Sequence, residues 1–274
     1  MWRCERLESG WHDRADHQSG LTPMALTAAD YSIDDLAELK EYLGDAYDHR
    51  RLERWEELVE EELASVGDEA TLYRSSEAYL YDLTVFAMSG TKLPYLAMLE
   101  RNLEPGARIL DYGCGIGADG LRLLERGYEV AFADFDNPST RYLRWRLGRR
   151  GIEAPIYDLE RDTIPSGFDA AFAFDVIEHV DDPVALLARM ESLARLVAVN
   201  LLESLPEELE NPLHRELPID ALLLRATERT PFRYERHHGR SNVILYGGDR
   251  AGRGSRAMQR ARVRIARRLR RKRP

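Results

Sequence analysis

The stretch Ile109-Leu-Asp-Tyr-Gly-Cys-Gly-Ile-Gly-Ala-Asp-Gly120 decides the fold of this 274-residue chain. Two apolar residues end at Asp111, and a run of glycines follows at once. This order predicts a buried strand, a tight turn whose backbone a ligand can approach closely, and then a helix. Because Asp111 lies at the end of the strand, its carboxylate favours a cationic ligand over an anionic one.

Acidic residues also follow the next three predicted strands. Asp134, Asp158 and Asp175 each come directly after an apolar segment with the composition of a strand. The carboxyl ends of parallel strands lie at one edge of a sheet, where open α/β folds bind ligands. A single acid in such a place is more often a helix cap or a solvated turn residue. Its recurrence at matching places predicts an acidic rim that binds a ligand.

Two cofactors fit the glycine turn. The string Gly115-x-Gly117-x-x-Gly120 matches the dinucleotide fingerprint, and Asp134 lies at the distance expected of an acid that binds a ribose hydroxyl. The charge of Asp111, however, opposes the pyrophosphate of NAD. S-adenosylmethionine carries a sulfonium and an ammonium group and no phosphate, so the acidic rim favours it. A dehydrogenase is therefore the least favoured functional interpretation.

Residues 90–247 resemble the class I S-adenosylmethionine-dependent methyltransferases, and are similar to the branch that includes the ubiquinone and menaquinone biosynthesis methyltransferases. The order and spacing of several motifs carry the resemblance, including the fourth-strand segment 168–180. It implies that Asp134 binds the ribose hydroxyls, and that Asp158 and Leu159 lie near the adenine amino group. The predicted cofactor-binding residues are Asp111, Gly113, Gly115, Gly117, Asp134, Phe135, Asp158, Leu159 and Asp175.

The elements predicted along the chain have the order of an α/β protein. Helix and strand patterns alternate from Pro94 onward, which predicts a Rossmann-like, mainly parallel seven-stranded sheet with helices on both faces. A late hairpin across Gly239 adds an antiparallel strand, as the resemblance also implies. The expected organisation is a disordered segment or misassigned start over 1–23, an N-terminal helical cap over 24–90, the methyltransferase domain over 91–248 and a basic tail over 249–274.

Three helices are expected within the cap. Ser32–Asp35 resembles a capping box and opens the first helix, and the others cover 50–66 and 69–89. The third contains tyrosines that either shape an acceptor pocket or pack the helices together: Tyr73, Tyr79 and Tyr81. In the helix after the second strand, an arginine-rich face is expected to be solvated: Arg141, Arg144, Arg146, Arg149 and Arg150.

The net charge of −9 conceals an asymmetry. Residues 250–274 contain twelve Arg and Lys residues and no acid, so residues 1–249 carry −21. This acidic body argues against a nucleic-acid substrate lying across it. The basic tail can contact phosphates, an anionic membrane surface or the acidic body. The simplest prediction for residues 250–274 is a disordered or frayed helical tail without a specific partner.

The remaining bulk features point to the cytoplasm. Cys4 and Cys114 provide neither a disulfide framework nor a metal cluster, and Cys114 reads as a packing residue. No apolar run reaches the length of a membrane span, and residues 1–20 lack the apolar core of a secretion signal. We therefore expect a cytoplasmic protein.

Methyl transfer from a sulfonium is an in-line displacement, which requires alignment and, for a protonated acceptor, a base. His179 is the predicted base, because it follows the fourth strand closely and histidine has an ordinary pKa of about 6.5. Glu178 would orient His179 or line the pocket. The alternative is that His179 only caps the turn before the next helix.

A divalent metal is a secondary hypothesis for the same segment. Asp175, Glu178 and His179 can project toward one pocket, and His214 would add a fourth ligand. Oxygen-rich sets of this kind suit magnesium or manganese better than structural zinc. We assign no residue as a metal ligand on this pattern.

The leading interpretation is S-adenosylmethionine-dependent methyl transfer to a small-molecule acceptor, at oxygen. A second interpretation is methylation of RNA or protein, with the basic tail recruiting the polymer. A third is a protein that binds S-adenosylmethionine but performs no chemistry.

Overall fold

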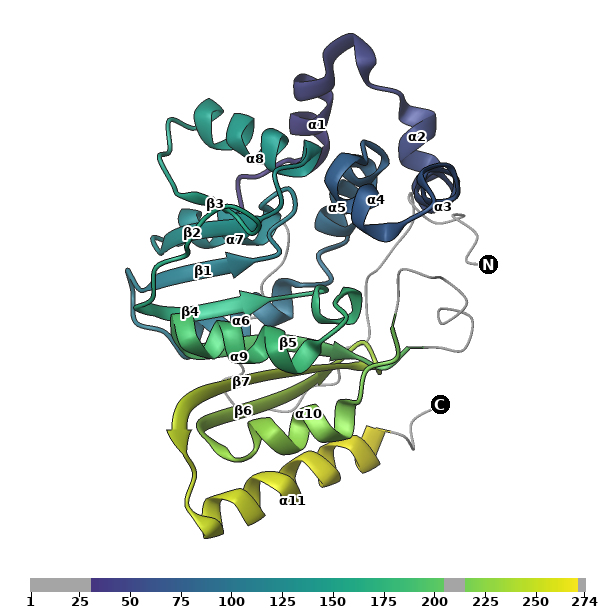
Figure 1. Ribbon diagram of the computed structural model, residues 1–274. Coiled ribbons are helices and arrows are strands. Elements are labelled where there is room, and N and C mark those ends of the chain that lie inside the picture. Colours follow the sequence, from purple (N-terminus) through teal and green to yellow (C-terminus); the bar gives the residue numbers. More distant parts are fainter. Residues whose placement is uncertain (1–30, 205–214, 271–274) are drawn as a thin grey trace, which may run out of the picture.

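A mixed β-sheet forms the centre of the molecule (Figure 1) in the computed structural model, which describes residues 31–204 and 215–270. Within these residues the strands are β1 (Arg108–Tyr112), β2 (Glu129–Asp134), β3 (Ile156–Asp158), β4 (Phe168–Ala173), β5 (Ala194–Leu202), β6 (Arg229–His237) and β7 (Ser241–Arg250). They form one seven-stranded sheet in the order β3-β2-β1-β4-β5-β7-β6. Strands β1 to β5 are parallel, whereas β7 is antiparallel to both β5 and β6. The predicted fold class is confirmed.

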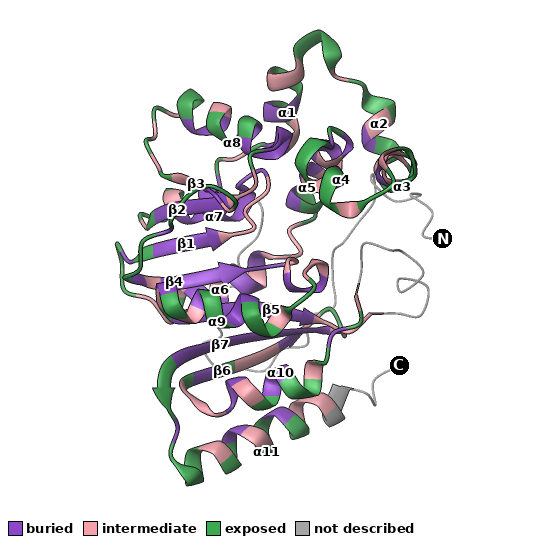
Figure 2. Ribbon diagram, in the orientation of Figure 1, coloured by how far each residue is buried: buried purple, intermediate pink, exposed green. Residues whose placement is uncertain are grey.

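Helices cover both faces of the sheet. One face carries α6 (Leu93–Glu100), α7 (Ala118–Glu125) and α8 (Pro138–Arg149), and the other carries α9 (Pro183–Leu193), α10 (Ile219–Ala226) and α11 (Arg253–Arg270). Because side chains alternate along a strand, Ile109 packs into one core and its neighbour Leu110 into the other, and both are fully buried. Figure 2 shows the resulting burial of the central strands.

Local sequence signals set the starts of two helices. The side chain of Asn137 accepts a hydrogen bond from the backbone N–H of Thr140 at 2.9 Å, and Pro138 occupies the first turn of α8, as predicted. Asp182 accepts from the backbone N–H of Ala185 at 2.8 Å and begins α9. The loops after β2 and β4 therefore end where the next helix is capped.

The N-terminal cap consists of short helices, not the three expected. They are α1 (Asp35–Leu43), η2 (Gly44–Ala46), α2 (His49–Glu53), α3 (Trp55–Val66), α4 (Glu69–Ser75) and α5 (Ala78–Ser89). The helix expected over 50–66 is interrupted at Arg54, and the helix expected over 69–89 is interrupted at Ser76. The N-cap of α1 is Asp34, which accepts from the N–H of Ala37 at 2.9 Å.

The sequence pattern predicted that Ser32 caps α1, but the N-cap is Asp34. The hydroxyl and the backbone N–H of Ser32 both donate to the carboxylate of Glu125 at the end of α7. The side chain thus joins the cap to the sheet domain. A partner that lies 93 residues away in the sequence cannot be deduced from a local capping pattern.

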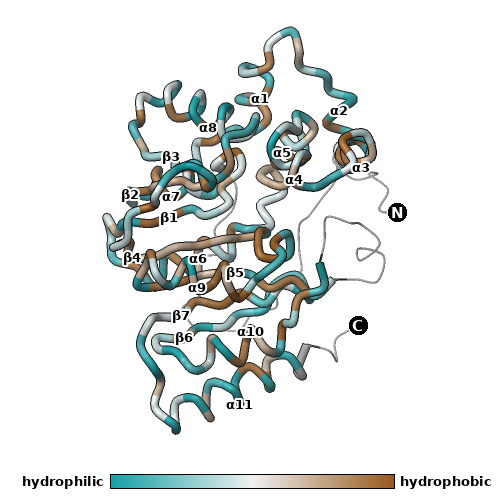
Figure 3. Tube along the Cα trace, viewed as in Figure 1, coloured by the Kyte–Doolittle hydropathy of each residue, from teal (hydrophilic) through white to brown (hydrophobic). Residues whose placement is uncertain are grey.

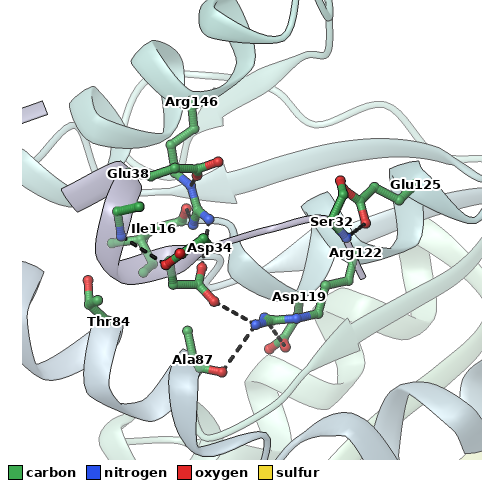
Figure 4. Close-up of polar contacts among 12 residues, drawn as sticks. Ser32, Asp34, Glu38, Thr84, Ala87, Ile116, Asp119, Arg122, Glu125 and Arg146 are labelled. Carbon is green, nitrogen blue, oxygen red and sulfur yellow. Dashed lines mark hydrogen bonds and ion pairs between the residues drawn. The ribbon is translucent and has the colours of Figure 1, made fainter. Parts of the chain in front are cut away.

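The arginine face of α8 is not uniformly solvated, which corrects the sequence-based expectation. Arg146 is fully buried, and its guanidinium donates to Asp35 at 2.6 Å, to Glu38 at 2.8 Å and to the carbonyl of Ile116 at 3.1 Å (Figure 4). Arg122 of α7 donates to the other oxygen of Asp35 at 2.6 Å. This cluster ties α1 to α7, to α8 and to the glycine turn.

The basic tail is also more ordered than expected over residues 253–270. These residues form α11, whose Arg260 lies 3.1 Å from Glu228 and whose Arg267 lies 3.2 Å from Glu203. Val263 is buried in the same core as α9 and α10. The acidic body is therefore the partner of this helix, because inward arginines and a buried valine hold it in place.

Other expectations fall outside the described residues, namely those for residues 1–23 and for His214. Across the described ranges, no helix combines the length and apolar character needed to span a bilayer.

Candidate active site

The glycine turn after β1 folds around two carboxylates, the buried Asp111 and the partly buried Asp134. Asp111 accepts a hydrogen bond from the backbone N–H of Gly120 at 3.1 Å. Asp134, at the end of β2, accepts from the N–H of Gly115 at 2.7 Å and from that of Phe135 at 2.7 Å. Both acids thus fix the path of the turn along the carboxyl edge of the sheet.

The glycines of the turn are required by conformation and by space. Gly113, Gly115 and Gly117 all have positive φ angles, of 73°, 51° and 70°. A Cβ at Gly117 would lie 2.3 Å from Leu143 of α8, and one at Gly113 would lie 2.7 Å from Val176. The turn therefore packs directly against α8 and against the loop after β4.

Burial changes the acid–base properties of both carboxyl groups. Desolvation raises the pKa of Asp134 to about 6, although its two backbone hydrogen bonds oppose the shift. Desolvation, reinforced by the nearby charge of Asp119, also raises the pKa of Asp111 well above its usual range. Both groups are therefore sensitive to a cation or a hydrogen-bond donor placed beside them.

Residues predicted to contact the ribose and the adenine gather at the ends of β2 and β3. Asp134 and Asp158 are register partners on these neighbouring strands, and the backbone N–H of Leu159 donates to the carbonyl of Asp134 at 3.0 Å. The guanidinium of Arg74, from the cap, lies 5.0 Å from the centre of the Phe135 ring. The carboxylate of Asp158 accepts from the N–H of Glu160 at 3.0 Å, so it also stabilises its own turn.

Lys92 is a cation that the sequence analysis did not single out. Its ammonium lies 2.9 Å from Asp119, just before α6. Burial lowers the pKa of Lys92, but the charges of Asp119 and Asp175 outweigh burial and raise it above its usual value. Asp82, on α5, is also near this ammonium, and burial raises its pKa to about 7. The acidic rim thus contains its own positive charge.

Asp175 is held by a residue on the neighbouring strand. Its backbone N–H donates to the side-chain oxygen of Asn200 at 2.7 Å, and the Asn200 amide donates back to the Asp175 carboxylate at 2.6 Å. Asp175 has a positive φ of 55°, which is uncommon for a residue with a side chain. The fully buried Asn200 of β5 therefore fixes a strained turn at the rim.

The predicted acid–base residues lie in η3 (Ile177–His179), over the carboxyl end of β4. Nδ1 of His179 lies 3.0 Å from the hydroxyl of Tyr73 on α4, so the cap reaches directly into the site. Burial raises the pKa of Tyr73 to about 12, which keeps its hydroxyl protonated. Of the three cap tyrosines, Tyr73 thus contacts a candidate site residue, whereas Tyr81 is buried within the cap.

Glu178 points into the protein, where it is 2% exposed. Desolvation, together with the charge of Asp175, raises its pKa to about 8. Among the described residues, none provides a hydrogen-bond partner for its Oε2 atom. Glu178 is therefore a mainly neutral carboxyl group near pH 7, enclosed by the protein.

The β6–β7 hairpin closes another side of this edge. His237 and His238 lie 5.6 and 6.1 Å from the ring of Tyr95, measured between ring centres. Nε2 of His238 lies 3.0 Å from the carbonyl of Thr91, directly before Lys92. These two histidines thus join the hairpin to α6 beside the candidate site.

The metal hypothesis gains no support from this arrangement. In the ranges 31–204 and 215–270, no group of three or more His, Cys, Asp or Glu side chains is placed to hold an ion. Asp175 is paired with Asn200, and His179 contacts Tyr73.

The sequence contained one weak signal for the residues that were missed. Lys92 is one of only three lysines among the 39 basic residues, so a lysine there departs from the arginine usage of the chain. For Tyr73 the sequence left two interpretations open, a residue that shapes the acceptor pocket or one that packs the helices together. Asn200 had no motif around it. Their roles depend on segments that meet only in the folded protein.

Known proteins with similar sequences are methyltransferases. Residues 110–196 match the family model described as a methyltransferase domain. The ubiquinone biosynthesis O-methyltransferase of Xanthomonas campestris pv. campestris (strain B100) is 29% identical over 114 residues, which cover 40% of this chain and 46% of that protein. The phosphoethanolamine N-methyltransferase of Triticum aestivum is 33% identical over 90 residues, 31% of this chain and 18% of that protein.

Among solved structures, magnesium protoporphyrin IX methyltransferase from Synechocystis PCC 6803 with bound S-adenosylmethionine is 16% identical with a TM-score of 0.46. The alignment covers 79% of this chain and 98% of that one. This chain spans about half the length of the ubiquinone biosynthesis relatives that it matches. Residues 110–196, which include most of the glycine turn, are therefore similar to methyltransferase domains.

Proposed function

We propose that this protein transfers the methyl group of S-adenosylmethionine to an oxygen atom of a small-molecule acceptor. The observation that carries the proposal is the pair Asp111 and Asp134, whose carboxylates accept hydrogen bonds from the glycine turn of a segment that matches a methyltransferase domain. The O-methyltransferases among the similar proteins support oxygen as the acceptor atom, while the wheat relative is named for transfer to nitrogen.

In this proposal the rim binds the cofactor from one end to the other. Asp134 exchanges its bond to Gly115 for the ribose hydroxyls, and Asp158 with Leu159 lies beside the adenine. The methionine end meets Asp111 and Asp175, whose charges complement the sulfonium and ammonium groups. Lys92 offers an ammonium group to the methionine carboxylate.

The acceptor lies between the rim and the cap. His179 takes the acceptor proton as the methyl group is transferred, so that the acceptor oxygen attacks as an anion. This role requires the tautomer in which Nδ1 donates to the oxygen of Tyr73 and Nε2 accepts the proton. The neutral, buried Glu178 lies next to His179 in η3 and orients it from inside the protein.

Two measurements test this function in sequence. Calorimetry with S-adenosylhomocysteine should show binding at one site, and its absence in the folded protein would remove the proposal. Radiolabelled methyl transfer is then measured with matched acceptors, a catechol and the corresponding aromatic diamine. Transfer to the catechol alone supports O-methylation. Transfer to the diamine alone assigns the acceptor atom to nitrogen, and binding without transfer to any acceptor in a broad panel favours a non-catalytic role.

A further inference from the structure

The outward face of α11 carries exposed apolar side chains on a helix that is otherwise rich in arginine. Met258 and Ile265 are 51% and 56% exposed, and they are among the most exposed large apolar residues in the described chain. Gly254, Met258, Ala261 and Ile265 are separated by four, three and four residues, so they form one stripe along the helix. The inward face is already used by the buried Val263.

The arginines of α11 divide into an inward and an outward set. Arg260 and Arg267 bind acids of the protein body. Arg253, Arg262 and Arg264 are exposed, and within the described residues no ion pair joins them to an acid. The outward set is therefore available to an anionic partner, whereas the inward set holds the helix in place.

Spacing places the outward arginines on both sides of the apolar stripe. Arg262 lies four residues after Met258, and Arg264 lies three residues after Ala261. Figure 3 shows α11 as a largely hydrophilic helix interrupted by apolar positions. An apolar stripe bordered by arginines is the pattern of a helix that lies in the interface of a membrane.

The charge distribution of the whole molecule orients this face. Helix α11 lies at the end of the molecule opposite α1, α2 and α3 (Figure 1). The basic residues 250–274 contrast with the −21 carried by residues 1–249. An anionic surface would therefore attract the α11 end and repel the remainder of the protein.

We propose that the outward face of α11 docks on an anionic lipid surface, with Met258 and Ile265 inserted among the acyl chains and the flanking arginines on lipid phosphates. A nucleic acid would use the arginines but would leave the two apolar side chains in water. An extended polyanion would also approach the acidic body, which opposes such binding. The observations therefore favour a lipid surface.

The position of α11 links this surface to the candidate active site. Arg267, near the C-terminal end of the helix, binds Glu203, which directly follows β5 at the carboxyl edge of the sheet. Docking through α11 would therefore hold that edge close to the lipid. The inference concerns binding to a surface and does not depend on the proposed methyl transfer.

Vesicle co-sedimentation of the full chain tests the inference. Vesicles of phosphatidylcholine with about 30% phosphatidylglycerol are compared with vesicles of phosphatidylcholine alone. We expect the anionic vesicles to bind at least tenfold more protein, and 0.5 M NaCl to weaken binding severalfold. Met258→Ser with Ile265→Ser keeps the charge and should reduce binding about tenfold. Arg262→Gln with Arg264→Gln should reduce it about 25-fold, at about fivefold for each arginine.

Matched controls make the result decisive. Val184→Ser replaces a side chain on α9 that is 45% exposed, and Arg195→Gln replaces an exposed arginine on β5. Neither variant should alter vesicle binding. Circular dichroism checks that every variant is folded. Absence of vesicle binding, or equal binding to neutral vesicles, overturns the inference. Loss of binding in the arginine variant but not in the serine variant, with tight binding of duplex DNA or RNA, would assign the face to nucleic acid instead.

Discussion

The guanidinium of Arg146 donates to the carboxylate of Asp35 across 2.6 Å, in a region from which water is almost completely excluded. The two residues come from α8 and α1, so this contact joins the Rossmann-like sheet domain to the helical cap that covers it (Figure 4). The same guanidinium binds the carbonyl of Ile116 within the glycine turn. The cap and the glycine turn are therefore joined by one buried polar cluster.

Arg146→Met should destabilise the protein by about 3–5 kcal/mol, because it leaves the buried carboxylates of Asp35 and Glu38 with too little compensating charge. Urea unfolding measures the change. The matched variant Arg149→Met removes an arginine that is 43% exposed and should cost about 1 kcal/mol or less. Equal losses in the two variants would show that burial of the cluster has no special energetic role.

Cofactor affinity should depend on the ionisation of Asp134. Its pKa is raised to about 6 by burial, and the carboxylate form is the one that accepts hydrogen bonds from ribose hydroxyls. The Kd for S-adenosylhomocysteine should therefore rise as the pH falls through 6, by up to about tenfold per pH unit. Asp134→Asn should weaken binding by about 1.5–3 kcal/mol at pH 8 and remove this pH dependence. Calorimetry between pH 5 and 8 provides both results.

Glu178 should make folding stability fall as the pH rises. Its pKa is raised to about 8 in the folded protein, so between about 4.5 and 8 the unfolded chain releases a proton that the folded chain retains. The contribution of the Glu178 carboxyl group to the free energy of unfolding is thus fully present below pH 4.5 and lost above pH 8. Glu178→Gln should raise the stability at pH 8.5 by up to about 5 kcal/mol relative to the native protein, and have little effect at pH 4.5.

The thermal midpoints of the two proteins at both pH values measure this difference. Glu129→Gln, at a side chain that is 73% exposed, is the control and should change neither midpoint. A benefit of Glu178→Gln that is the same at both pH values would argue against proton uptake by this carboxyl group.

Turnover should depend on the contact between His179 and Tyr73. His179→Ala removes the proposed base and should lower kcat by about 10²–10⁴, with an unchanged Kd for S-adenosylhomocysteine. Tyr73→Phe removes the hydroxyl that contacts Nδ1 of His179, and should lower kcat about tenfold while changing KM little. Tyr81→Phe is the control, since its hydroxyl accepts from the N–H of Asp48 inside the cap. Native kcat in both the His179 and Tyr73 variants would mean that the acceptor needs no base here.

Much of the sheet and of the acidic rim could be predicted from local patterns. Asp111 and the glycines of the turn lie within nine residues, and Asn137 with Pro138 marks the start of α8 without reference to the rest of the chain. Such signals survive in a single sequence because their physical causes are local: strand periodicity, positive φ at glycine and helix capping.

The predictions that were wrong concern contacts between residues that lie far apart in the sequence. Arg146 was expected in water, because its helix is rich in arginine, yet its partners Asp35 and Glu38 come from a helix more than 100 residues earlier. Ser32 was expected to cap its own helix, but it donates to Glu125. Residues 253–270 were expected to lack a partner, but acids from three separate segments bind their arginines.

The sequence by itself determined the order of strands and helices, the glycine turn and the carboxylates at the strand ends, since each follows from interactions between near neighbours in the chain. Only the tertiary structure decided which charged groups are buried, and with it the ammonium of Lys92 in the acidic rim, the raised pKa of Glu178 and the contact of Tyr73 with His179. Desolvation and ion pairing depend on what surrounds a group in space, and that environment exists only after distant segments have packed together.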